Sequence, residues 1–154
     1  MAENVANSFY QTVNFHFRVE FVTDTENIDV RFQSVSGLDA TLDTETVKEG
    51  GENRFEHVIP VRRKYGPLVL KRGLLSPSQS AMLTKWLKEA FDDEKVKPLA
   101  LLQVSLLNEE HQTLMLWKLS NVWPRSWKIG ELNAERGEVL IETLELNYNR
   151  LIFE

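Results

Sequence analysis

Apolar and polar side chains alternate along much of the chain, which is the pattern of a β-strand with one buried face. The clearest case is residues 15–21, in which Phe or Val takes every odd position and a polar residue every even one. Further strands are expected at residues 31–36, 38–47, 54–59, 68–71, 99–107, 113–121 and 138–148. Together these segments predict a mainly β (α+β) fold, a small antiparallel β-barrel or sandwich of about eight strands.

Residues 76–92 have the periodicity of a helix instead. Ser76 is a suitable N-cap, Pro77 suits the first helical position, and Gln79 can complete a capping box. The apolar residues recur every three or four positions, and those expected to face the core include Leu83, Trp86, Leu87 and Phe91. The chain shows no repeat, low-complexity tract or linker, so residues 1–154 are expected to form a single domain with this helix on its flank.

The segment 39–53 is unusual for a hairpin because it is long, polar and rich in Thr and Val. It contains the pair Gly50-Gly51, which permits the backbone angles of a reversing tip. A hairpin with few apolar side chains buries little surface against its own domain, so it either stays exposed to solvent or contacts another chain. Both interpretations remain open from composition alone.

Two tryptophans, Trp123 and Trp127, stand on either side of Pro124. Proline lacks the backbone N–H of a ladder, so Pro124 is expected to end the pairing of the preceding strand. Indole rings supply large, rigid contact surfaces that are common at interfaces. The same two residues could equally form a corner of the core.

Residue patterns for catalysis, cofactors or metals are missing from the sequence. The chain has three histidines, His16, His57 and His111. Their spacing is not that of metal ligands, so they are expected at the surface. Glu138, Glu142 and Glu145 are expected on a solvated or lumen-facing acidic strand. We therefore predict no enzymatic activity, no cofactor and no metal site.

The charge and cysteine content narrow the choice of partners. A formal net charge of −5, from 18 basic and 23 acidic residues, disfavours binding to a phosphate backbone. The absence of cysteine fits assembly in a reducing cytoplasm. The first residues lack the basic and apolar regions of a secretion signal, and no apolar run is long enough to span a membrane. The protein is therefore expected to be made in the cytoplasm and to be soluble.

Six short motifs occur in a characteristic order along nearly the whole chain. They are FHFRV at 15–19, FQSVSGL at 32–38, EGGEN at 49–53, LVLKRG at 68–73, WKLSNVWP at 117–124 and IETLEL at 141–146. In this order and spacing the sequence resembles the tail-tube family of contractile phage tails and extracellular contractile injection systems. One departure is PVRRKY at 60–65, where Pro-Gly is expected in many relatives, and it would alter a local turn.

The resemblance implies a mode of assembly. In this family six copies of a small β-barrel or sandwich pair edge to edge, and the ring has a continuous sheet on its inner surface. Rings then stack into a hollow tube, and the long arm reaches the neighbouring ring. The inter-ring contacts implied for this chain are Thr41, Thr44, Thr46, Val47, Glu49, Gly50, Gly51 and Asn53.

The resemblance also implies a set of partners. These are further copies of the chain, a contractile sheath protein, spike and baseplate hub proteins, a tube initiator and a tail terminator or cap. Effector cargo or DNA would occupy the lumen, without recognition of a nucleic-acid sequence. The subunit would be assembled in the bacterial cytoplasm and end in a virion tail or an extracellular or cell-associated injection particle.

Sheath contraction would drive the rigid tube through the target envelope. The tube protein of the type VI secretion system would have a related fold. Two alternatives are weighed against this function. One is a tube-initiator paralogue that joins the spike to the tube. The other is a ligand-binding β-barrel that uses Trp123 and Trp127.

Overall fold

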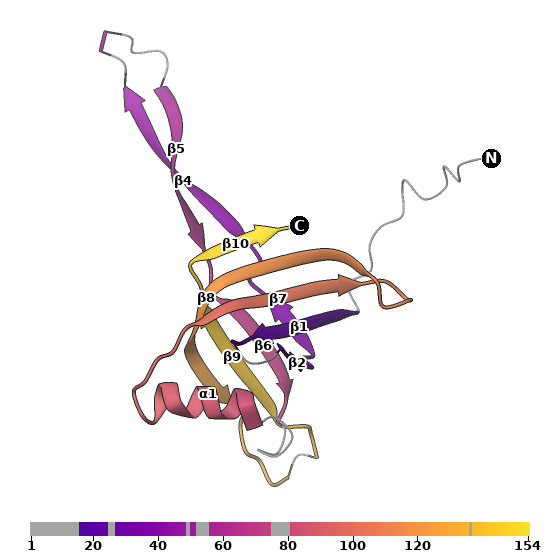
Figure 1. The fold of residues 1–154 in the computed structure, drawn as a ribbon. Helices are drawn as coiled ribbons and strands as arrows, with labels where there is room; N and C mark the ends of the chain where they lie inside the picture. The colour runs from indigo at the N-terminus through magenta and orange to yellow at the C-terminus, as the bar shows by residue number, and fades with distance from the viewer. Residues whose placement is uncertain (1–15, 25–26, 49, 52–55, 75–80, 136) are drawn as a thin grey trace, which may run out of the picture.

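The computed structural model describes residues 16–24, 27–48, 50–51, 56–74, 81–135 and 137–154. Within them the fold is mainly β with one helix (Figure 1). The elements are β1 (Phe17–Val22), β2 (Asn27–Val30), β3 (Ser34–Ser36), β4 (Ala40–Lys48), β5 (Glu56–Tyr65), β6 (Leu68–Gly73), α1 (Ala81–Phe91), β7 (Leu99–Leu107), β8 (Thr113–Ile129), β9 (Ile141–Asn147) and β10 (Arg150–Phe153).

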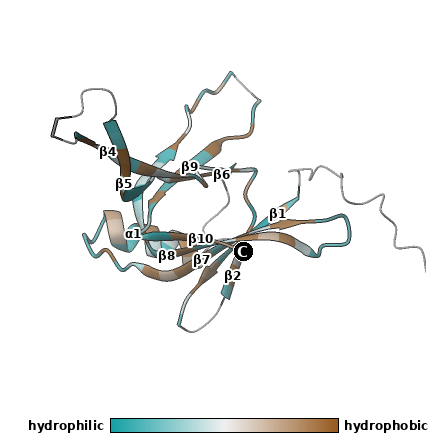
Figure 2. Ribbon diagram, turned by 90° about the horizontal axis from the view of Figure 1, so that it is seen from above, coloured by the Kyte–Doolittle hydropathy of each residue, from teal (hydrophilic) through white to brown (hydrophobic). Residues whose placement is uncertain are grey.

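Eight of these strands form one antiparallel sheet in the order β2-β1-β7-β8-β9-β6-β3, in which β10 also pairs with β8. Strand β8 pairs with β7 as far as Val122 and with β9 from Trp123 onward. The sheet is thereby divided into two halves that share β8, and the view from above in Figure 2 shows β6 and β9 in one half and β7 and β10 in the other. The fold is therefore sandwich-like and not a closed barrel.

The core lies between the two halves and follows the alternation of the sequence. In β9 every second residue is buried, and β6 has the same pattern at Leu68 and Leu70. Apolar burial of this kind is the main favourable contribution to folding. Further core residues on the strands are Val19, Phe21, Val30, Leu102, Val104, Leu119, Val122, Leu144 and Leu146.

Helix α1 covers one side of this core through Leu83 and Leu87, which are both buried. Trp86 is half-buried, and its Nε1 donates a hydrogen bond to the Lys97 carbonyl oxygen at 2.7 Å. The expectation for Phe91 is wrong, because this side chain is 41% exposed. Phe91 is the last residue of α1 and lies beyond the edge of the core. The proposed helix start at 76–79 lies outside the described residues.

Strand β8 also corrects the interpretation of Pro124, which does not end the pairing. Pro124 lies opposite Leu146 of β9, and the ladder continues to Ile129. A register shift between Pro124 and Ser126 accommodates the missing donor, as is usual for a proline at a bulge.

Two further strands were not predicted. Strand β2 is only four residues long, and β10 follows β9 after a two-residue connection, so both are too short to show an alternation of their own.

Replacing Leu87 by Ala is expected to lower the free energy of unfolding by roughly 2–5 kcal/mol, because the side chain is fully buried and would leave a cavity. Met82 lies on the same helix but is exposed, so Met82→Ala is the matched control and should change stability by less than about 1 kcal/mol. Urea denaturation followed by circular dichroism measures both. Equal effects would contradict the assignment of this helix face to the core.

Candidate functional site

Strands β4 and β5 form a two-stranded sheet of their own that projects from the body of the molecule, here called the arm (Figure 1). The strands are paired from Ala40–Tyr65 at the base to Lys48–Glu56 near the tip, with a register shift between Asp43 and Thr44. The arm is longer than the segment 39–53 expected from the sequence, because all of β5 belongs to it.

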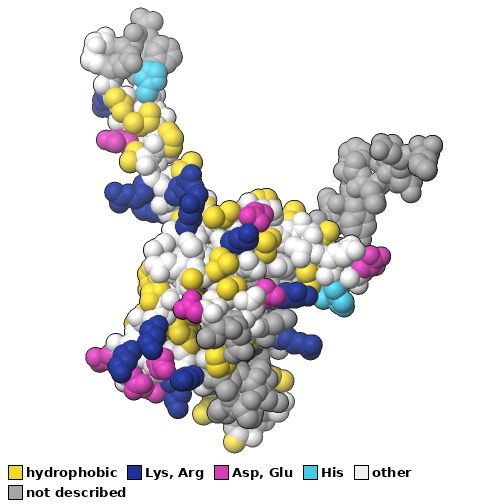
Figure 3. Space-filling model, viewed as in Figure 1, with side chains coloured by type: hydrophobic (Ala, Val, Ile, Leu, Met, Phe, Trp, Pro, Cys, Tyr) yellow, Lys and Arg dark blue, Asp and Glu magenta, His cyan; other side chains and the backbone are white. Residues whose placement is uncertain are grey.

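The arm is exposed on both of its faces within the described residues. Apart from Asp43 and Tyr65, every described side chain of β4 and β5 is exposed. Figure 3 shows apolar side chains along its length and basic side chains at its base. The exposed large apolar residues are Leu42, Val47, Val58, Ile59 and Val61. An isolated two-stranded hairpin is marginally stable in water, so this apolar surface is suited to contact with another chain.

The ion pairs among the described residues of the arm are exposed. Lys64 forms an ion pair with Asp43 at 2.7 Å, and Lys48 lies 3.9 Å from Glu56. Exposed pairs of this kind contribute between 0 and about 1 kcal/mol. The backbone ladder therefore provides most of the cohesion of the arm.

The root of the arm is packed tightly against the body. Gly37 has a φ of 90°, and a Cβ at this position would lie 2.1 Å from the Pro67 carbonyl oxygen. The Tyr148 hydroxyl donates a hydrogen bond to the Gly37 carbonyl oxygen at 3.3 Å. The rings of Tyr65 and Tyr148 are 5.5 Å apart. Burial raises the pKa of Tyr148 to about 12, and Asp39 and Tyr65 act in the same direction.

The residues predicted for the inter-ring contact fall on the arm where the structure describes them. Thr41, Thr44, Thr46 and Val47 are exposed residues of β4. Gly50 and Gly51 are in the turn at the tip, and Gly51 has a φ of 95° that favours glycine. Glu49 and Asn53 lie outside the described residues.

Trp127 lies at a corner of the core. It is half-buried, and its Nε1 donates a hydrogen bond of 2.5 Å to Glu142. Its ring stacks on Phe91, with centroids 6.5 Å apart. The geometry thus fits the core-corner interpretation for Trp127, while Trp123 is half-buried where β8 changes partner.

Glu142 was expected on a solvated or lumen-facing strand, and this is wrong. The residue is 3% exposed and forms an ion pair of 2.5 Å with Arg72, its cross-strand neighbour on β6. The Arg72 guanidinium also lies 5.6 Å from the centre of the Phe32 ring. No local pattern in the sequence indicates this pair, because its members are 70 positions apart.

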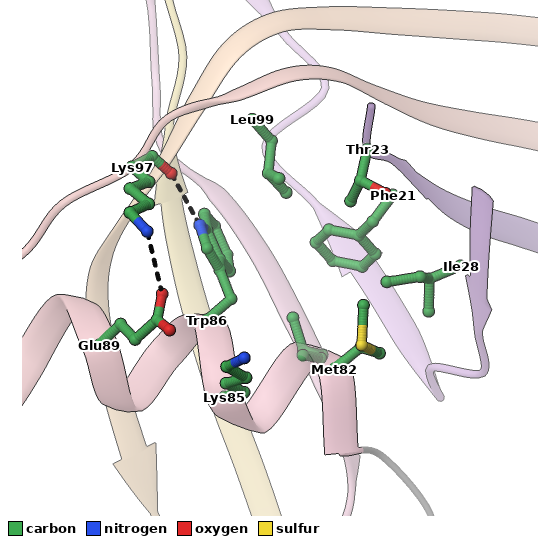
Figure 4. A pocket seen from close by; sticks show the side chains of 10 residues that line it. Phe21, Thr23, Ile28, Met82, Lys85, Trp86, Glu89, Lys97 and Leu99 are labelled. Carbon is green, nitrogen blue, oxygen red and sulfur yellow. Dashed lines mark hydrogen bonds and ion pairs between the residues drawn. The ribbon is translucent and has the colours of Figure 1, made fainter. Parts of the chain in front are cut away.

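One hollow of the structure, of about 240 Å³, lies between α1 and the end of β1 (Figure 4). Its walls are largely apolar, with Phe21, Ile28 and Trp86 among them, and Lys97 lies 3.9 Å from Glu89 at one side. Among the described residues no group of His, Asp and Glu could hold a metal ion. None of the helices found in those residues is long and apolar enough to cross a membrane.

Removing the carboxylate of the buried ion pair should be costly. Glu142→Gln keeps the size of the side chain but leaves the buried Arg72 charge unbalanced, so the free energy of unfolding should fall by roughly 3–5 kcal/mol. Glu145→Gln is the control on the same strand and should change it by no more than about 0.5 kcal/mol. Denaturant titration of both variants tests this, and a small effect at Glu142 would contradict it.

Tyr148 should make stability depend on alkaline pH. Its pKa in the folded state is about 12, against about 10 when unfolded, so the stabilisation is complete below pH 10 and is lost as the pH rises toward 12. The urea midpoint of the wild type should therefore fall more between pH 9 and pH 11 than that of Tyr148→Phe. Identical decreases would contradict the assignment.

The chain is similar in sequence and in architecture to known proteins. Residues 13–152 match the family model described as T4-like virus tail tube protein gp19. A chain in the cryo-EM structure of the anti-feeding prophage (AFP) baseplate, 6-fold symmetrised, is 32% identical with a TM-score of 0.84, over 94% of this chain and 96% of that one. No protein of curated function matches the sequence at a significant level.

Other solved structures share the fold. A chain of the PVC sheath-tube complex, an extracellular contractile injection system in the extended state, has a TM-score of 0.80 at 23% identity, covering 99% of both chains. A chain of the AFP tube-terminating cap has a TM-score of 0.77 at 25% identity, covering 94% of this chain and 91% of that one. An Hcp protein has a TM-score of 0.57 at 12% identity, covering 90% of this chain and 91% of that one. This likeness shows the fold alone. The chain belongs to the T4-like virus tail tube protein gp19 family, a structural and non-enzymatic family of tail tube proteins.

Proposed function

We propose that the chain is a ring subunit of the inner tube, and that its rings stack into a hollow, rigid tube which sheath contraction drives through a target envelope. The observation that carries this proposal is the arm, because a two-stranded sheet exposed on both faces is marginally stable by itself and is stabilised further by contact with another chain. The tube would conduct effector cargo or DNA. Both halves of the sheet share one core, which supports a single tail-tube domain over residues 1–154.

The edges of the large sheet support closure into a ring. Among the described residues the sheet ends at β2 and β3, and β10 pairs with β8 on only one of its sides. Phe153 and Ile152 of β10 are exposed. Open edges invite pairing with other strands, and a closed ring satisfies them with copies of the same chain. A stack of such rings then needs a second contact, which we assign to the arm.

A second candidate function is the ring that joins the tube to the baseplate. The observation in its favour is the greater identity to the AFP baseplate chain, 32%, than to the PVC sheath-tube chain, 23%, or the AFP cap chain, 25%. The two functions differ in a simple way, because a bulk subunit polymerises into long tubes and a joining ring does not. Electron microscopy of the purified chain at increasing concentration distinguishes them.

The partners we propose follow from the same relatives, which are chains of structures containing a sheath, a terminating cap or a baseplate. We infer that this chain contacts the corresponding sheath, cap or terminator, initiator and spike or baseplate proteins. Assembly would take place in the bacterial cytoplasm, before the particle is released or attached to a cell.

Shortening the arm should separate ring formation from stacking. Asp43 and Arg62 lie opposite each other, so residues 44–61 can be replaced by Asn-Gly while the pairs nearer the root are kept. The variant should remain folded and form rings, but it should not form tubes, because each interface between rings loses the contacts made by the outer part of the arm.

Circular dichroism reports the fold of this variant, and electron microscopy reports rings and tubes in the same samples. Val47→Asp, which adds a charge to an exposed apolar position of the intact arm, should weaken stacking less completely. Normal tubes from the shortened variant would show that stacking uses another surface. Loss of the fold would show that the arm stabilises the body.

A further inference from the structure

The arm and the loop between β8 and β9 lie at opposite ends of the same strands. In the pairing of β6 with β9, Leu68 lies opposite Leu146 and Gly73 opposite Ile141. The arm leads into the Leu68 end through Tyr65, and the loop 130–140 enters β9 at the Ile141 end. Figure 1 shows the arm above the body and this loop below it. Two copies stacked along these strands therefore bring the arm of one to the loop of the other.

The described part of this loop has an acidic and apolar surface. A hollow of about 340 Å³ is lined by Glu131 and Glu138 together with Leu132 and Val139. Leu132 is 80% exposed and Val139 is 70% exposed. Apolar side chains that are this exposed beside carboxylates form a surface suited to a partner that is both apolar and basic.

The ends of the loop are fixed to the sheet. The Gly130 backbone N–H donates to the Ile141 carbonyl oxygen at 2.9 Å, and the Leu74 N–H donates to the Leu140 carbonyl oxygen at 2.8 Å. Within the loop, the Asn133 side-chain oxygen accepts a hydrogen bond of 3.0 Å from the Glu135 N–H. The hollow is thus held at a defined place at the end of β6 and β9.

The base of the arm has the complementary chemistry. Leu42 and Arg63 are cross-strand neighbours, so they share one face, and both are exposed. Arg62 is the neighbour of Asp43 on the opposite face, where Asp43 already pairs with Lys64. The Leu42–Arg63 face thus combines a cation with apolar surface.

We propose that the Leu42–Arg63 face of one subunit docks on the Glu131–Glu138 hollow of a second copy in the next ring. This inference rests on the proposed function and names the surface that receives the arm. The contact is head-to-tail, so each subunit gives its arm at one end and receives another at the other end, and the stack can grow without closing. The base of the arm, and not only its tip, would then specify the register between rings.

The test compares the concentration above which tubes sediment, with electron microscopy and circular dichroism on the same samples. Arg63→Ala and the double change Glu131→Lys/Glu138→Lys should each raise this concentration by at least about tenfold, because each loses a close charge pair between subunits. Arg63→Glu combined with Glu131→Lys/Glu138→Lys restores opposite charges and should recover most of the loss. High salt should weaken wild-type stacking in the same direction.

Two further variants of the chain serve as matched controls. Arg62→Ala removes the same charge from the opposite face of the arm and should leave the concentration unchanged. Glu109→Lys/Glu110→Lys makes the same charge change as the loop variant, at exposed residues in the β7–β8 turn. It should also leave stacking unchanged.

The outcomes separate the inference from the function on which it rests. If the Glu131→Lys/Glu138→Lys variant stacks like the wild type, or its stacking is weakened no more than that of the Glu109/Glu110 control, the proposed docking surface is wrong. The tube function still stands in that case. If the combined charge exchange forms rings but recovers no stacking, the pairing is wrong as well. If the wild type forms neither rings nor tubes at any concentration, both the function and the inference fail.

Discussion

Strand β8 changes its pairing partner from β7 to β9 between Val122 and Trp123. This change of partner fixes how the two halves of the sheet lie relative to each other. Asn121, with a φ of 53°, lies immediately before it. Because one continuous strand of 17 residues belongs to both halves, neither can move without straining the other. The same strand carries Trp127 to the buried Arg72–Glu142 pair and places β9 so that Tyr148 reaches the root of the arm. The direction of the arm therefore depends on a strand far from it in sequence.

Alternation of side chains was sufficient to predict the body of the fold, because most strands have one face in the core and one outside. β7 was predicted with its observed bounds, and β9 within three residues. The same signal does not tell whether a strand joins the core sheet. β5 has apolar residues at Val58, Ile59 and Val61, yet all three are exposed on the arm. Its polar partner β4 was the informative strand, since its Thr-rich sequence led to the arm.

Sequence reasoning missed the buried ion pair between Arg72 and Glu142. A glutamate within a strand usually faces water, and only the register of β6 with β9 brings Arg72 opposite Glu142. The family, in contrast, was recognisable from the order of short motifs, and the match over residues 13–152 confirms it. The roles of individual arm residues remain predictions, because they concern a contact between subunits.

The position of the arm at one end of the strands gives any head-to-tail assembly of this chain a polarity. One terminus of such an assembly displays unoccupied arms, and the other displays only surfaces that would receive them. A protein that starts the assembly and a protein that stops it must therefore present different complementary surfaces. A single factor could not bind both termini by the same face, so the polarity of such an assembly would follow from the asymmetry of one subunit.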